Sequence, residues 1–189
     1  MKKITIIIIA ILFMAAPVFS YGQTEEGTQP EKNISYTFIN EYGLYTGGTV
    51  GFTGIFVNGI KFNKTQDVIG LGIGYEVDAG PFNFYYSEGS QSVPIFVNYR
   101  HYFPSKRKLK PLVNIAVGAR FSFWTEYNYW YDDWGNYYSN WQQQKGVGLY
   151  GTAAAGFKVK AFSFTSGFFV KSWNNVYFGG VEVKVGFTF

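Results

Sequence analysis

From residue 34 to the end of the chain, apolar side chains return at every second position along a series of short segments. The last segment shows this most clearly, because Val181, Val183, Val185, Phe187 and Phe189 alternate with glutamate, lysine, glycine and threonine. Successive side chains of a β-strand point to opposite faces, so such a segment has one apolar and one polar face. The alternation therefore predicts β-strands with one face in an apolar environment.

Short breaks or loops divide this part of the chain into eight such segments. They are residues 34–45, 50–62, 67–77, 92–103, 109–124, 146–160, 161–172 and 176–189. The first two are less regular, since Ile39, Ile55 and Val57 fall on the face that is otherwise polar. We include both because an antiparallel barrel closes with an even number of strands. The prediction is an all-β, eight-stranded antiparallel up-and-down transmembrane β-barrel over residues 34–189.

The connections between the segments differ in length in a regular way. The two long loops follow the third and fifth segments, and every even-numbered connection is short. Long outer loops and short periplasmic turns are typical of barrels in the outer membrane. We therefore expect the N-terminus in the periplasm and residues 125–145 outside the cell.

Composition decides which solvent the apolar face meets. Aromatic residues make up 22% of the chain and charged residues only 15%, against about 25% charged in a typical soluble domain. A soluble barrel or sandwich is the alternative, but it would turn its apolar face inward and carry charges outside. Here the polar face is rich in glycine, serine and threonine, and aromatics gather near both ends of the apolar face. This pattern favours lipid around the barrel.

The N-terminus has the features of an export signal. Lys2 and Lys3 precede an apolar core over residues 4–16, and Pro17 and small residues follow. We expect a signal peptide over residues 1–22 and a polar, disordered lead-in over residues 23–33. The absence of cysteine excludes disulfides, cysteine nucleophiles and lipid attachment to an N-terminal cysteine. A net charge of +4 gives no indication of a nucleic-acid partner.

With its signal peptide, eight segments and C-terminal Val181-x-Val183-x-Val185-x-Phe187-x-Phe189, the chain resembles the small OmpA/OmpX-like outer-membrane β-barrels. It is particularly similar to the "outer membrane β-barrel" or porin-family proteins of Bacteroidota-type bacteria. The resemblance implies a location in the cell outer membrane of a Gram-negative bacterium, surrounded by outer-membrane lipid. It also implies that Val185, Phe187 and Phe189 form the signal read by the barrel-assembly machinery. We expect a monomer, and because the family is functionally mixed, the fold does not settle the role.

Alternation also places charged residues on the inner face of the barrel. The expected interior polar network consists of Glu76, Arg100, Arg120, Glu182 and Lys184. An eight-stranded barrel is about narrow enough for side chains to fill it, and an unpaired charge inside costs several kcal/mol. We therefore expect mutual pairing that plugs the interior. The alternative is a small passive, porin-like transporter for ions or small solutes.

The long loop at residues 125–145 is the best candidate for a binding site. Its centre, Asp132 to Asn136, is typical of a turn, so the loop is expected to form a hairpin that prolongs two strands. Tyrosine and tryptophan supply large contact area at low entropic cost. We expect an extracellular glycan or protein ligand here, the alternative being a self-packed hairpin on the lipid head groups. The candidate residues are Tyr127, Tyr129, Trp130, Tyr131, Trp134, Tyr137, Tyr138 and Trp141.

Catalytic and metal chemistry find little support in the sequence. His101 is the only histidine, so a metal site lacks further ligands. Lipid A deacylases of this barrel class use a histidine and a serine two residues later, but Phe103 stands at that position. The expectation is a protein that is not an enzyme and has no cofactor, with a lipid A-modifying enzyme as the less favoured alternative.

Overall fold

The computed structural model describes residues 33–81, 89–173 and 176–189, which belong to one unit of the chain, Asn33–Phe189. The predicted signal peptide lies outside the described residues, as does the lead-in except for Asn33. Within the described part no helix is long and apolar enough to cross a membrane. Eight strands are described. They are β1 (Ile34–Thr46), β2 (Thr49–Phe62), β3 (Asp67–Pro81), β4 (Gln91–Tyr102), β5 (Leu109–Tyr131), β6 (Tyr137–Val159), β7 (Phe162–Trp173) and β8 (Val176–Thr188).

Each strand pairs antiparallel with the next along the chain, and β8 pairs with β1 to close the ring. The closing pair runs from Ile39 opposite Thr188 to Thr46 opposite Val181. Two further backbone hydrogen bonds, 3.0 and 2.8 Å long, join Phe38 and Phe189 beyond this register. The predicted eight-stranded antiparallel up-and-down barrel is therefore confirmed. Closure matters physically because it leaves no unpaired strand edge within the ring of eight strands.

The two faces of the strands differ as alternation requires. Along β4 and β8 exposed positions alternate with buried ones almost without exception. The exposed positions carry valine, isoleucine, leucine and aromatic side chains, such as Leu71, Val97 and Val183. Described charged residues are either buried inside the barrel or lie near its two ends. An uncharged apolar band therefore surrounds the middle of the barrel.

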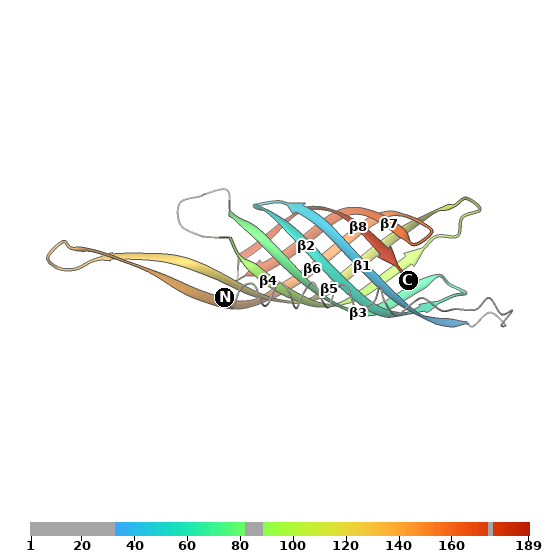
Figure 1. The fold of residues 1–189 in the computed structure, drawn as a ribbon, viewed down its shortest axis with the longest axis horizontal. Helices are drawn as coiled ribbons and strands as arrows, with labels where there is room; N and C mark the ends of the chain where they lie inside the picture. Colours follow the sequence, from blue (N-terminus) through green and yellow to red (C-terminus); the bar gives the residue numbers. More distant parts are fainter. Residues whose placement is uncertain (1–32, 82–88, 174–175) are drawn as a thin grey trace. The chain divides into compact units, whose positions relative to one another are not determined.

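The two ends of the barrel differ. One end, here called the turn end, carries the connections β2–β3, β4–β5 and β6–β7, of which the last is the two residues Lys160 and Ala161. At the opposite end, β5 and β6 continue as a two-stranded ribbon that projects beyond the other strands (Figure 1). Both strands are 23 residues long and stay paired up to Tyr131 and Tyr137. The sequence bounds 109–124 and 146–160 were therefore too short for these strands.

Candidate functional site

The barrel interior holds a balanced set of buried charges. Among the described residues, the carboxylates Glu41, Glu76, Asp78 and Glu182 and the cations Arg100, Arg120, Lys171 and Lys184 are all at most 3% exposed. Four negative groups thus face four positive ones, and each belongs to at least one ion pair. All five residues of the expected interior network lie in this set.

Glu76 is the centre of the larger cluster. Its carboxylate accepts a hydrogen bond from Arg120 Nε at 2.9 Å and another from Lys171 Nζ at 2.6 Å. These partners come from β5 and β7, so the bonds cross the lumen from β3. Nearer the turn end, Arg100 Nη2 of β4 donates to Glu41 Oε1 of β1 at 2.7 Å. These hydrogen bonds link opposite walls of the barrel across its lumen.

Sequence reasoning missed two members of this cluster, Tyr45 and Asp78. Asp78 accepts hydrogen bonds from the Tyr45 and Ser90 hydroxyls, at 2.5 and 2.8 Å, and from Arg120 Nη2 at 2.5 Å. The Lys171 ammonium lies 3.5 Å from the centre of the Tyr45 ring, in a cation–π contact. Asp78 has the same parity as Glu76, so extending the predicted third strand by one residue would have found it.

An apolar layer also fills the interior. Ile39, Ile55 and Val57, which broke the alternation in the sequence, are at most 1% exposed and pack with Phe96 and Leu112. Alternation places these three residues on the inner face, and the structure buries them there as an apolar layer. A narrow barrel packs its centre with side chains of either kind. These residues therefore belong to a buried apolar cluster inside the barrel.

Aromatic rings occupy the space beside inward glycines. A Cβ at Gly72 would clash with the Phe96 ring, and one at Gly51 would clash with the Tyr45 ring. Each glycine leaves room for a large neighbour, and that neighbour fills it. At these two positions the inner glycines therefore make room for a neighbouring aromatic ring.

The tip of the β5–β6 ribbon is held by Asp132. Its carboxylate accepts hydrogen bonds from the backbone N–H groups of Trp134 and Asn136, at 3.0 and 2.8 Å, and from the Asn136 side chain at 2.9 Å. Gly135 has φ 77°, a conformation that favours glycine. The hydrogen bonds, that from the Asn136 side chain first, hold the pKa of Asp132 below its usual value. At a pH above the ordinary pKa of an aspartate, the charged Asp132 carboxylate therefore stabilises the turn. This stabilisation is lost when the pH falls through the lowered pKa that Asp132 has in the folded protein.

Aromatic side chains pair across the ribbon on both of its faces. On one face the Tyr127 and Trp141 rings lie 4.8 Å apart, and the Tyr131 and Tyr137 rings 5.6 Å apart. By register, Tyr129 belongs to this face, although its side chain lies outside the described part. On the opposite face Trp130 and Tyr138 stack at 5.9 Å. Trp134 at the tip is 89% exposed.

The first of these faces continues the apolar outer surface of the barrel. In β5, positions 121 and 123 share the parity of Tyr127 and Tyr131, and both carry exposed phenylalanines. The second face continues the lumen side, where Ser122 is buried. We call the face with Tyr127, Tyr131, Tyr137 and Trp141 the outer aromatic face.

Two further predicted features lie on the outside of the barrel. Val185, Phe187 and Phe189 are all about half exposed on the outward face of the C-terminal strand and the residue after it. His101 Nδ1 lies 2.7 Å from Asp67 Oδ1, and its ring packs edge-on against Phe103 at 4.7 Å. No group of three potential metal ligands occurs among the described residues.

Comparison with known proteins places the fold among solved outer-membrane barrels. The chain is similar to a major outer membrane protein from Thermus thermophilus, with 14% identity over 82% of this chain and 100% of that one, at a TM-score of 0.50. The N-terminal β-barrel domain of Pseudomonas aeruginosa OprF matches with 12% identity, 81% and 97% coverage and a TM-score of 0.49. Ail, the attachment invasion locus protein of Yersinia pestis, matches with 11% identity, 84% and 99% coverage and a TM-score of 0.49.

No family model matches the chain, and no curated protein matches it either. The similarity to the Thermus protein is therefore structural, and at 14% identity it shows the fold alone. The chain has the fold of a small outer-membrane β-barrel.

Proposed function

We propose that this protein is a closed barrel of the outer membrane that holds the β5–β6 ribbon outside the cell as a binding element. The observation that carries this proposal is the outer aromatic face, which prolongs the apolar surface of the barrel beyond its rim. Outer-membrane lipid would surround the band below it, and the barrel-assembly machinery would insert the chain by its C-terminal strand. The protein would act as a monomer and without catalysis.

The ligand suggested by the ribbon is a sugar chain with apolar faces and hydroxyl edges. Tyr131, Tyr137 and Trp141 are each more than half exposed, so their rings retain free surface after pairing across the strands. Tyrosine and tryptophan combine an apolar ring with a polar tip, which matches such a ligand. A protein surface is the alternative occupant, favoured by the same rings.

Matched double variants on the two faces of the ribbon test this function. Tyr127→Ser with Trp141→Ser removes one ring pair from the outer aromatic face, and Trp130→Ser with Tyr138→Ser removes one from the opposite face. On an array of neutral oligosaccharides, we expect the first variant to bind its sugar about tenfold or more weaker, because exposed aromatic anchors each contribute more than about 1 kcal/mol. The second variant is expected to stay within about threefold of the wild type.

A second control checks that the ribbon is still exposed on the cell surface in both double variants. The chain has no cysteine, so Trp134→Cys gives a single thiol at the tip, open to a membrane-impermeant maleimide on intact cells. Labelling of this thiol in both double variants shows that the ribbon still reaches the outside. Equal loss of sugar binding on both faces, or no binding by the wild type, would contradict the sugar-binding role.

A closed interior predicts that the barrel does not conduct. The bonds from Glu76 to Arg120 and Lys171 cross the lumen, and the apolar layer with Phe96 lies farther along it. We expect no steady unitary currents when the purified protein is inserted into a planar bilayer. Reproducible unitary steps in the wild type would instead support the passive transporter.

A further inference from the structure

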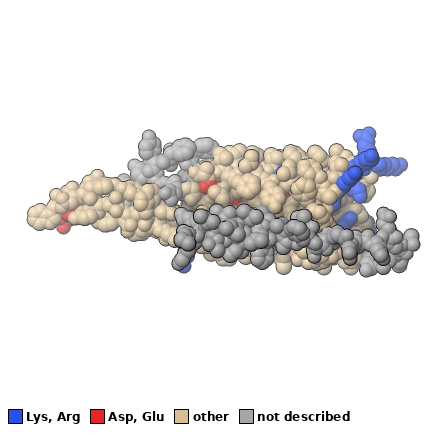
Figure 2. All heavy atoms as spheres, in the orientation of Figure 1, with Lys and Arg blue, Asp and Glu red and all other residues tan. Residues whose placement is uncertain are grey.

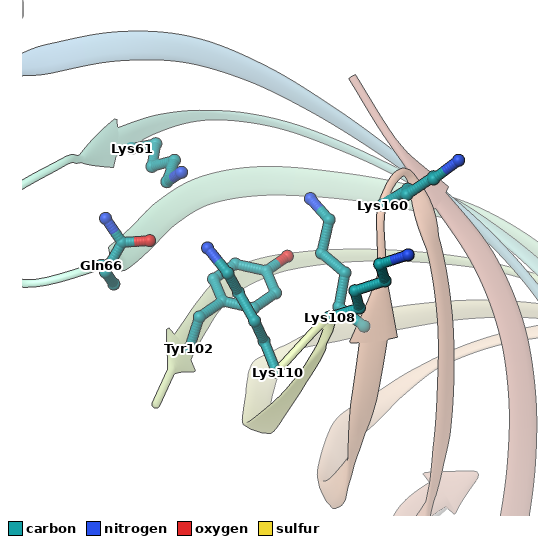
Figure 3. Close-up of a pocket in the computed structure, with 7 residues that line it drawn as sticks. Lys61, Gln66, Tyr102, Lys108, Lys110 and Lys160 are labelled. Atoms are coloured by element: carbon teal, nitrogen blue, oxygen red, sulfur yellow. The ribbon is translucent and has the colours of Figure 1, made fainter. Parts of the chain in front are cut away.

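Lysines gather at the turn end of the barrel, where Figure 2 shows most of the visible basic side chains. Five of them line one cavity together with Gln66 and Tyr102, and Figure 3 shows these side chains coming from separate strand ends and turns. We call these five the lysine mouth. They are Lys61, Lys108, Lys110, Lys158 and Lys160.

In the part of the chain that the structure describes, the positive charges of the lysine mouth are not balanced by carboxylates, as those of the barrel interior are. Inside, four carboxylates face four cations, but no ion pair among the described residues includes a lysine of the mouth. Lys110 and Lys158 stand directly opposite each other in the β5–β6 register. Like charges in opposite positions of a strand pair are destabilising. An anion bound between these lysines would reduce their mutual repulsion.

The cavity is small. Its volume is about 190 Å³, the space of roughly six water molecules. Tyr102, which is 3% exposed, forms part of its wall, and the Lys158 ammonium lies 5.1 Å from the centre of that ring. Lys61, Lys110 and Lys158 share the parity of buried neighbours in their strands, so they belong to the lumen side. They therefore differ from lysines on the outer face of a barrel, whose side chains extend toward lipid head groups.

Backbone strain is concentrated at the same place. Among the described residues, Gln66 and Lys160 are the non-glycine residues with positive φ, at 61° and 54°. Both line this cavity. Such conformations cost free energy and tend to persist where the side chain has a function. Gln66 and Lys160 thus stand in two turns whose positive φ glycine or asparagine would adopt at lower cost.

We propose that the lysine mouth binds a phosphate or diphosphate group. Several ammonium groups around a small cavity suit a compact anion that carries more than one charge, and lysine binds phosphate as a point charge. A single carboxylate would leave most of these lysines uncompensated. The phosphate belongs either to a soluble compound or to a phospholipid head group at this end of the barrel.

Calorimetric titration with inorganic pyrophosphate tests the site. The purified protein is held in an uncharged, phosphate-free detergent, and Lys110→Gln with Lys158→Gln is compared with Lys64→Gln with Lys106→Gln. The control lysines are exposed in turns at the same end but do not line the cavity, so both variants lose two charges there. We expect one pyrophosphate per barrel and about tenfold or greater weakening in the first variant, because two charge-assisted contacts are lost. The control is expected to stay within about twofold.

A second arm separates the two sources of phosphate. The wild type is titrated in phosphatidylcholine nanodiscs with and without phosphatidylglycerol. Loss of pyrophosphate binding in the presence of phosphatidylglycerol assigns the site to a head group, and unchanged binding assigns it to a soluble phosphate. The proposal is overturned if the wild type binds no pyrophosphate, or if both double variants weaken equally.

Discussion

Replacing Arg100 by methionine is expected to lower the free energy of unfolding of the barrel by about 3–5 kcal/mol, because the substitution leaves a buried carboxylate without its partner. Arg100 and Glu41 have side chains 0% and 1% exposed and form an ion pair of 2.7 Å. The remaining Glu41 side chain is 1% exposed, so we expect its lone charge to be poorly solvated. The loss is measured by urea titration of the barrel in lipid vesicles, followed by tryptophan fluorescence.

The matching double variant separates the cost of a lone charge from the cost of lost packing. Glu41→Leu with Arg100→Met removes both charges, and we expect it to recover at least half of the loss, since apolar replacement of a whole buried pair is often neutral. Lys145→Met removes an exposed cation and is expected to change stability by no more than about 0.5 kcal/mol. If Arg100→Met is as stable as the wild type, the interior is hydrated and the plugged barrel is wrong.

Ile73→Arg is expected to destabilise the barrel by about 2–4 kcal/mol, although Ile73 is 51% exposed. Ile73 pairs with Ile95 in the middle of the apolar band, between the levels of Tyr99 and Phe123. On a surface that faces water, an exposed arginine costs at most about 0.5 kcal/mol. In the centre of a bilayer the guanidinium must be removed from water, so the same change is costly.

The control for this substitution lies on the same molecule but outside the band. Gln143→Arg introduces the same side chain at an exposed position of the ribbon, where it stays hydrated. Unfolding of both variants in vesicles is followed as for Arg100→Met. Equal stability of Ile73→Arg and Gln143→Arg would show that the band meets water.

The outer surface of the barrel could be predicted from the sequence because it follows one rule without exceptions in several strands. Every second residue of β8 from Val181 to Phe187 meets the same medium, so alternation alone assigns its face. The inner surface follows no such rule. It combines ion pairs near Glu76 with an apolar layer near Ile55, and only the closed ring shows which walls face each other.

The two candidate sites also differ in how far the sequence alone could predict them. The aromatic residues of the ribbon are close together in sequence, so their density was visible, but their division between two faces required the register of Tyr127 with Trp141. The lysine mouth was not predicted, because its members come from different strands and turns. Lys61 and Lys158 are far apart along the chain, and only barrel closure brings them to one cavity.

The central claim is that acyl chains, not water, cover the apolar band. Sedimentation velocity on the purified protein after its exchange from detergent into plain buffer tests this most directly. We expect association or precipitation, because the band that includes Leu71, Val97 and Val183 would then be exposed to water. A folded monomer that stays in solution without detergent or lipid would contradict the account.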